Sequence, residues 1–306
     1  MCGRVCCTLS PDDLSSACSY KNNNGKFVKV PWIRKGYEYK ECTNISPRDV
    51  VPCILSGEKV AMEDKRVLCP MLWSIIPPWI QGDLKQLNIA THNSCVERVF
   101  ESKLYSPLIE KKQRCIVVVE GFYEWSQQGT VKGTKQPYYI YKLQKDGIKA
   151  DVTSTWNNSW SEDDGWNGFN LIKLAALFNT FKSKEGEEKY SCTILTRMPK
   201  SNKWIHDRIP IMLNSDRDEK IWLHNSITSS KAIELIQIQG TFEDTLKYHT
   251  VSSIVNKSLN KSEDCRKYVK RSIGQTSLLN NWLAGGSIGK RKSEDSNHNN
   301  TKRTKN

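Results

Sequence analysis

Short apolar runs, separated by glycine, proline, asparagine and aspartate, fill the chain up to about residue 270. Short runs rich in β-branched and aromatic residues and bounded by such turn formers are typical of β-strands. Pro52 lies inside one of these runs and predicts an edge strand, because proline has no N–H to donate to a neighbouring strand. We expect strands at Asp49–Leu55, Arg114–Glu120, Pro137–Leu143, Ser191–Thr196 and Tyr248–Val255.

Helical patterns are fewer. Ser10 precedes Pro11, and a serine N-cap with proline in the first turn marks a helix start. Many strands with few helices predict an α+β domain built around a mainly antiparallel sheet or barrel. We expect helices at Pro11–Ser19, Ser215–Leu223 and Ser229–Ile238, a hairpin loop at Gly129–Gln136 and an exposed insertion at Asn157–Gly168.

The composition changes near residue 270, which predicts one domain over residues 1–270 and a low-complexity basic tail over residues 271–306. Apolar residues are scarce from about residue 284, so we expect disorder there. Basic clusters at Lys290–Lys292 and Lys302–Lys305 fit a nuclear import signal and predict a nuclear protein. Gln275–Leu283 could bind a partner groove, such as that of a sliding clamp, or could be a last amphipathic turn of the domain.

The charge of the chain changes the choice of partners. Lysine and arginine number 46 against 33 acidic residues, a net charge of +13. Residues 290–306 carry six basic and two acidic residues, a net of +4, which leaves +9 for residues 1–289. The body is therefore basic too, which favours nucleic acid or another anionic partner. No apolar run is long enough for a membrane span, and no export signal is evident, so we expect neither membrane insertion nor secretion.

The chain has 11 cysteines, an odd number, and no export signal, which argues against disulfides. No C-x-x-C pair occurs, and a structural zinc site would need such paired spacings. We therefore expect no metal and no other cofactor, with most thiols serving as small buried apolar side chains.

Cys2 is the first residue with distinctive chemistry. Initiator methionine is usually removed before a small residue, and its removal would leave an α-amine and a thiol on Cys2. Their reference pKa values, about 7.7–8.0 and about 8.5, make both groups partly nucleophilic at neutral pH. Such an aminothiol condenses with an aldehyde through a Schiff base and then closes a thiazolidine ring. The alternative interpretation is an ordinary cysteine.

Three further segments could carry chemistry. Glu124 follows two aromatic residues at the end of an apolar strand, where desolvation would raise its pKa and suit it to acid–base catalysis, unless the strand end is exposed. His206 lies in the sequence HDRIP with Arg208, a turn that could hold phosphate and transfer a proton, or could be an ordinary surface turn. Trp73 begins an aromatic and proline cluster that ends at Trp79 and suits either stacking on single-stranded bases or core packing.

Taken together, these segments form a recognisable set. Six motifs occur in one order: MCGR at the start, TNISPR (Thr43–Arg48), MLWSIIPPW (Met71–Trp79), GFYEW (Gly121–Trp125), HDRIP (His206–Pro210) and VSSIVNKSLN (Val251–Asn260). The set resembles the SRAP family and is similar to its eukaryotic branch. The resemblance spans about residues 1–270, and MCGR together with GFYEW is its most specific part.

The resemblance implies a compact α+β domain around a β-barrel-like sheet with a positive groove for DNA. It implies binding of single-stranded DNA at abasic sites and covalent cross-linking through Cys2 after loss of Met1. Glu124 matches the family's acid–base carboxylate, His206 a histidine near the phosphate, and Asn93 an asparagine that hydrogen-bonds the thiazolidine. The positions that match groove residues are Arg4, Asn44 and Arg208, to which the stacking interpretation adds Trp73.

Ser74 and Ile209 depart from the family without touching the proposed chemistry, and a third departure bears on DNA binding. The usual N-x-R-x-[DE] segment begins here at Asn93, and Cys95 stands where an arginine normally meets phosphate. The loss should reduce DNA affinity and the salt dependence by about one counterion equivalent. Arg98 or Arg48 could compensate for it.

The expected function is therefore a sensor of abasic sites in single-stranded DNA that shields the lesion by a thiazolidine cross-link. The Schiff base implies a latent lyase activity, and self-processing of Met1 implies a thiol peptidase activity. We expect a monomer that needs no cofactor. Two alternatives stay open: a non-covalent single-strand-binding module in which Cys2 is incidental, and a thiol peptidase that uses Cys2 with His206.

Overall fold

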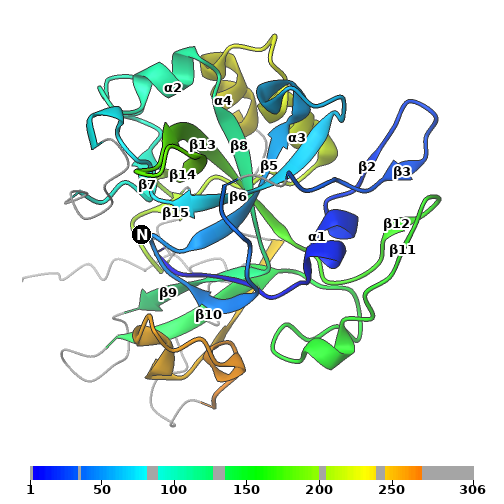
Figure 1. The fold of residues 1–306 in the computed structure, drawn as a ribbon. Helices are drawn as coiled ribbons and strands as arrows, with labels where there is room; N and C mark the ends of the chain where they lie inside the picture. The colour runs from blue at the N-terminus through cyan, green and yellow to red at the C-terminus, as the bar shows by residue number, and fades with distance from the viewer. Residues whose placement is uncertain are drawn as a thin grey trace, which may run out of the picture.

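A closed ring of five strands forms the centre of the molecule (Figure 1). The ring runs β13, β8, β5, β6 and β14 and closes where β14 pairs again with β13. Closure leaves a barrel without free edges along these strands. This computed structural model describes residues 3–33, 36–80, 89–126, 135–199, 205–238 and 245–270. The barrel strands are β13 (Ile172–Lys182), β8 (Arg114–Val119), β5 (Val50–Ser56), β6 (Arg66–Trp73) and β14 (Glu188–Arg197).

Two short strands extend the barrel at β14. β15 (Ile209–Pro210) pairs with it in antiparallel fashion, and β7 (Asn93–Cys95) pairs with it in parallel. The contact of β14 with β6 is also parallel, whereas the other barrel pairings are antiparallel. The expected α+β domain around a mainly antiparallel barrel-like sheet is therefore confirmed.

A second sheet of five strands packs below the barrel in Figure 1 and has antiparallel pairings throughout. Its central strand, β9, leaves β8 after a single residue, so the chain passes directly from the barrel into this sheet. The order is β16 (Leu246–Thr250), β10 (Gln136–Lys142), β9 (Gly121–Ser126), β1 (Val5–Cys7) and β4 (Cys42–Ile45).

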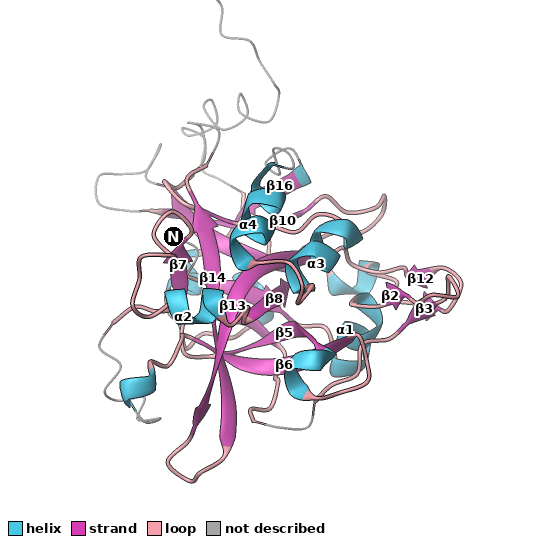
Figure 2. Cartoon of the chain, turned by 90° about the horizontal axis from the view of Figure 1, so that it is seen from above, coloured by secondary structure: helices cyan, strands magenta, loops and turns pink. Residues whose placement is uncertain are grey.

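Helices cover the outside of the barrel. α2, α3 and α4 contact one another or the strands β8 and β13, and Figure 2 shows α3 and α4 over the barrel strands. Ser10 and Ser215 cap α1 and α3, each accepting a backbone N–H bond at 3.1 Å, as their sequence positions predict. The helices are α1 (Pro11–Ala17), α2 (Ser106–Glu110), α3 (Asp216–Leu223) and α4 (Ser229–Ile238), and the 3₁₀ turns are Gly57–Val60, Pro78–Ile80, Thr153–Thr155, Ser253–Asn256 and Glu263–Cys265.

The five predicted strands and three predicted helices all occur, but the edge position predicted from Pro52 is wrong. β5 lies inside the barrel between β8 and β6. Pro52 is tolerated there because it stands opposite Pro70, and its ladder with β8 begins only at Cys53. No partner strand therefore needs its missing N–H.

Two other predictions need adjustment. The strand expected at Tyr248–Val255 ends at Thr250 and gives way to a 3₁₀ turn. The insertion Asn157–Gly168 is largely exposed but contains a hairpin of β11 (Trp160–Ser161) and β12 (Gly165–Trp166); a similar hairpin joins β2 (Tyr20–Lys21) to β3 (Phe27–Val28). The expected tail, Gln275–Leu283 and most of Gly129–Gln136 lie outside the described residues.

The thiols of the described residues are all free, and most are buried. Cys53 on β5 and Cys192 on β14 are not on neighbouring strands, yet their Sγ atoms lie 3.9 Å apart. These side chains therefore fill the barrel interior, which fits the expectation that most of the cysteines act as small apolar residues.

Candidate active site

Glu124 lies in the middle of β9, and its side chain is only 2% exposed. Burial raises the pKa of Glu124 to about 7, because the charged form loses its hydration. The strand can pack closely here because it begins at Gly121, where a Cβ would lie 2.6 Å from the Ile140 carbonyl oxygen. A carboxyl group with such a pKa can both donate and accept a proton near neutral pH.

The start of the chain runs antiparallel beside Glu124. Val5 pairs with Phe122, and the N–H of Tyr123 donates to the Arg4 carbonyl at 2.9 Å. Continuing this register by one residue sets Gly3 across from Glu124. Cys2 lies outside the described residues, and Gly3, the first described residue, follows it in the sequence.

Arg4 and Asn44 hold a turn of the chain that follows β16. The Arg4 guanidinium donates to Asn44 Oδ1 at 3.0 Å and to the Val255 carbonyl at 2.6 Å. Asn44 is fully buried, and its Nδ2 donates to the carbonyls of Val255, Lys257 and Asn260. The Asn44 side chain therefore cannot contact DNA directly, and its role is to fix this turn beside Arg4.

The HDRIP segment approaches Glu124 from the barrel. Asp207 raises the pKa of Glu124 further, so its charge lies near that carboxyl. Asp207 also pairs with His206 Nδ1, while the backbone N–H of Arg208 lies 3.2 Å from the same nitrogen. Burial lowers the pKa of His206, and the Asp207 charge opposes this shift.

Arg208 is engaged within the protein. Its guanidinium makes two hydrogen bonds to the Glu97 carboxylate, at 3.0 and 2.7 Å, and further bonds to Thr196 at the end of β14. Such a two-point contact fixes the arginine geometrically as well as electrostatically. Arg208 therefore joins the HDRIP turn to the segment after β7. Glu97 was in the motif but was not singled out, because sequence does not show which arginine it faces.

Asn93 begins β7 and is nearly buried beside Ile194 of β14. Two residues after β7, the Glu97 carboxylate accepts from Arg208 of the HDRIP turn. Strand pairing and the Asp207 charge thus bring β7, the HDRIP turn and β9 to one side of the molecule. Among the predicted site residues, Asn93, Glu124 and His206 gather there.

Trp73 is fully buried, and its Nε1 donates to the His92 carbonyl at 2.9 Å. The predicted stacking role does not fit this position, whereas the alternative of core packing does. The exposed ring of the cluster is Trp79, which is 62% exposed. Ile75 is hydrogen-bonded to Thr91, so the segment that leads to Trp79 runs beside the start of β7. The two prolines before Trp79 were the available signal, since the run of buried residues that follows β6 continues only as far as Pro77.

The two arginines expected to compensate for the arginine missing at position 95 are both exposed. Cys95 is half-buried on β7, Arg98 follows three residues later, and both Arg98 and Arg48 are exposed. Either cation is therefore accessible to a phosphate, although only Arg98 belongs to the segment next to β7.

Metal and membrane features are limited in the described part of the chain. It contains no group of three histidine, cysteine or acidic side chains placed to hold a metal ion. No described helix has the length and apolar character of a membrane span.

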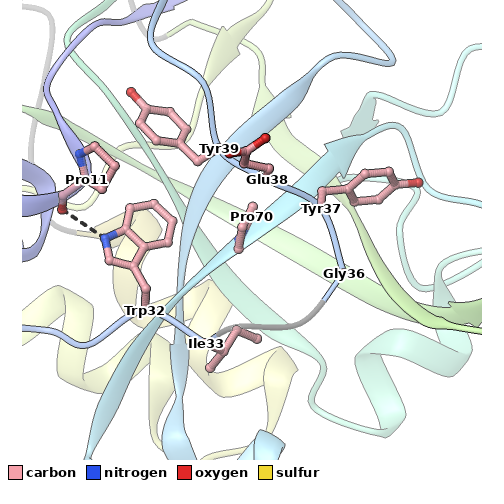
Figure 3. A pocket seen from close by; sticks show the side chains of 8 residues that line it. All are labelled: Pro11, Trp32, Ile33, Gly36, Tyr37, Glu38, Tyr39 and Pro70. Atoms are coloured by element: carbon pink, nitrogen blue, oxygen red, sulfur yellow. Dashed lines mark hydrogen bonds between the residues drawn. The ribbon is translucent and has the colours of Figure 1, made fainter.

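A separate cavity of about 390 Å³ lies beside Trp32 and Tyr39, whose rings stack at a centroid distance of 5.5 Å (Figure 3). The Trp32 indole N–H donates a hydrogen bond to the Pro11 carbonyl. None of the predicted site residues lines this cavity. It is therefore distinct from the site around Glu124.

Known proteins match most of the chain. It is 35% identical over 278 residues to the abasic site processing protein HMCES of Xenopus tropicalis, covering 87% of this chain and 77% of the relative. It is 28% identical to the abasic site processing protein YoqW of Bacillus subtilis, covering 86% and 98%. A crystal structure from Bordetella bronchiseptica shares the fold with a TM-score of 0.56 at 14% identity, covering 82% and 100%.

A family model described as SOS response associated peptidase (SRAP) matches residues 1–258. This range contains the barrel, the second sheet and each predicted site residue. The chain therefore belongs to the SRAP family, as the motifs predict.

Proposed function

We propose that this protein processes abasic sites in single-stranded DNA by forming a covalent cross-link through Cys2. The observation that carries the proposal is the buried carboxyl of Glu124, with its pKa of about 7, set across from the first described residue of the chain. The names of the relatives, which refer to abasic site processing, support the substrate class. The basic body, with a net charge of +9 over residues 1–289, supports DNA as the partner.

The proposed capture of DNA requires no base recognition. Phosphate contacts carry no sequence information, and an abasic nucleotide has no base that must first be flipped out. The exposed ring of Trp79 is suited to stack on a neighbouring base, as aromatic side chains do in single-strand-binding proteins. Arg98 and Arg48 are the accessible cations for phosphate.

The chemistry follows from an aldehyde and an aminothiol. Glu124 in its acid form donates a proton to the ring oxygen of the sugar while the C1′ hydroxyl gives up its proton to water, and the hemiacetal opens to the aldehyde. The neutral Cys2 amine adds to C1′, and water leaves to give a Schiff base. The Cys2 sulfur then adds to the same carbon while its proton passes to nitrogen, which closes the thiazolidine. Ring closure removes the iminium that would otherwise promote β-elimination, so strand cleavage is only a latent lyase activity.

Intact mass spectrometry tests the proposal. The full chain is incubated with a single-stranded oligonucleotide bearing one abasic site and, as a control, with the same oligonucleotide undamaged. We expect a heat-stable adduct on Cys2 with the damaged strand only, and its loss in Cys2→Ser. A full-strength adduct with Cys2→Ser, or with a chain whose first amine is acetylated, would refute the assignment.

The family description favours a second activity, hydrolysis of the bond after Met1. The Cys2 thiol would attack the Met1 carbonyl, and His206 would supply the proton transfers. Synthesis in an extract depleted of methionine aminopeptidase separates this activity from host processing. Loss of Met1 there in the wild type but not in His206→Ala supports self-processing; retention of Met1 in both contradicts it.

A further inference from the structure

Strand β1 is short, and its own sequence leaves its register weakly defined. Val5, Cys6 and Cys7 are all fully buried and apolar. The strand has two residue pairs with β9, and its pairing with β4 is irregular between Val5 and Cys7. Register is strongly specified where one face is buried and the other is polar, because a slip by one residue exchanges the two faces. In β1 such a slip would exchange one apolar face for another.

Glu120 fixes the register that the sequence of β1 leaves weakly defined. This residue lies between β8 and β9 and is fully buried. Its Oε1 accepts the backbone N–H bonds of Thr8 and Leu9, the second at 2.8 Å. Its own N–H donates to the Cys6 carbonyl at 2.9 Å. These bonds end β1 at one defined residue, because a slip would offer Glu120 the wrong N–H groups.

Arg266 holds the Glu120 carboxylate in place from the far end of the described chain. Its Nη1 lies 3.1 Å from Glu120 Oε2 and 3.0 Å from the Thr8 hydroxyl. The guanidinium also lies 5.0 Å over the ring of Trp156 and pairs with Glu263. Both members of the Arg266–Glu120 pair are buried, so neither is screened by solvent. The pair therefore fixes a charged acceptor at the end of β1.

We propose that Glu120 is a positioning residue that sets the register of β1 against β9 and so places residue 2 beside Glu124. The inference rests on the proposed function, because it assigns Glu120 a role in bringing the Cys2 aminothiol to its acid–base partner. A slip by one residue would displace the chain by about 3.3 Å and turn each side chain to the opposite face of the sheet. The aminothiol would then be directed away from the Glu124 carboxyl.

Two double variants isolate the acceptor from the ion pair. Glu120→Gln with Arg266→Met keeps an oxygen that can accept from Thr8 and Leu9. Glu120→Met with Arg266→Met has a side chain of similar length and no such oxygen. Both variants lose the buried charges in the same way, so they differ in the capping of β1.

We expect the cross-linking rate at saturating abasic oligonucleotide to fall about tenfold or more in the Met/Met variant. The Gln/Met variant should stay within about threefold of the wild type. Affinity for an oligonucleotide with a tetrahydrofuran site, which has no aldehyde, should be unchanged in both. Equal cross-linking rates in the two variants would overturn the proposal, and so would a parallel loss of rate and affinity. If the Met/Met variant does not fold, Glu120→Asn with Arg266→Met replaces it, because its amide is one methylene too short to reach Thr8.

Hydrogen exchange tests the cap independently of the chemistry. Backbone amides in a peptide covering residues 3–9 should exchange faster in the Met/Met variant than in the Gln/Met variant. If the wild type forms no adduct, the proposed function fails while this comparison still tests the cap. If the wild type cross-links but exchange is equal in the two variants, the positioning role alone is wrong.

Discussion

Strand β1 runs between two buried glutamates whose surroundings differ. At the C-terminal end of β1, the closed end, the Glu120 carboxylate accepts hydrogen bonds from Arg266 and from the backbone N–H groups of Thr8 and Leu9. Burial raises the pKa of Glu120, and Arg266 and these hydrogen bonds oppose the shift. At the N-terminal end of β1, the open end, the partner is Glu124. Burial raises the pKa of Glu124 to about 7, and the nearby Asp207 charge adds to the effect.

The difference shows how one fold uses the same side chain in two ways. Both carboxyl groups are buried: Glu120 is the residue between β8 and β9, and Glu124 lies four residues later within β9. An arginine and two amides give Glu120 a structural role, since they stabilise its charge. Burial dominates at Glu124: the amino-terminal charge, a backbone hydrogen bond at Trp125 and Lys135 oppose the shift only in part, and the pKa stays at about 7. A carboxyl group in that range suits proton transfer.

The largest expected effect tests the open end directly. Glu124→Gln should slow cross-linking by about a hundredfold or more at pH 7, because general acid–base groups contribute on the order of 10² to 10⁴. The wild-type rate should peak between the pKa of Glu124, about 7, and that of the α-amine, about 8. The variant should lose the decline on the alkaline side. The cross-linking rates of the wild type and the variant are measured against pH with abasic single-stranded oligonucleotides. If the rate still declines on the alkaline side in the variant, Glu124 is not the general acid.

The substitution Glu124→Gln should slow the reaction but raise the stability of the protein at alkaline pH. A carboxyl whose pKa is raised on folding binds its proton more tightly in the folded state, so the protein loses stability as the pH rises from about 4.5 to about 7. Glu124→Gln escapes this loss and should be more stable than the wild type at pH 8 by up to about 3 kcal/mol. The two should be equal near pH 4.5.

Urea denaturation at pH 5 and pH 8 measures that difference. Glu120→Gln is the matched control, because it removes the buried carboxylate that faces Arg266 and leaves this arginine only the Glu263 pair, so it should destabilise at both pH values by about 3–5 kcal/mol. Equal behaviour of the two glutamine variants would show that the two ends of β1 do not differ as described.

Removing the exposed Trp79 ring should weaken the binding of single-stranded DNA. Trp79→Ala should reduce affinity for single-stranded DNA by about 1–3 kcal/mol, because base stacking on an aromatic side chain has that magnitude. Fluorescence anisotropy with an undamaged oligonucleotide measures it. Met198→Ala, which removes another exposed apolar side chain, should leave the affinity nearly unchanged and serves as the control. Equal losses in both variants would exclude specific stacking on Trp79.

The smallest expected effect concerns the missing arginine. Cys95→Arg should add one phosphate contact and steepen the plot of log affinity against log salt by about 0.7 for a single strand. Cys95→Gln controls for size without charge. An unchanged slope would mean that the β7 side of the open end does not meet a phosphate.

Much of the architecture was readable from local patterns. The serines that cap α1 and α3, and the apolar runs of β8, β10 and β14, have signals that depend only on neighbouring residues. Pro52 misled because strand order is a long-range property, and Pro70 accommodates it from another strand. The motifs likewise identified the family, since MCGR and GFYEW are continuous in sequence.

The chain alone determined which residue types were available at the candidate site: a cysteine at position 2, a glutamate after two aromatics, and a histidine two residues before an arginine. Tertiary structure decided which of these groups are accessible and what charge they can carry. It buried Trp73 and exposed Trp79, and it engaged Asn44 and Arg208 with other parts of the protein. It also separated Glu120 from Glu124, because desolvation and neighbouring charge depend on contacts that the linear order of residues does not specify.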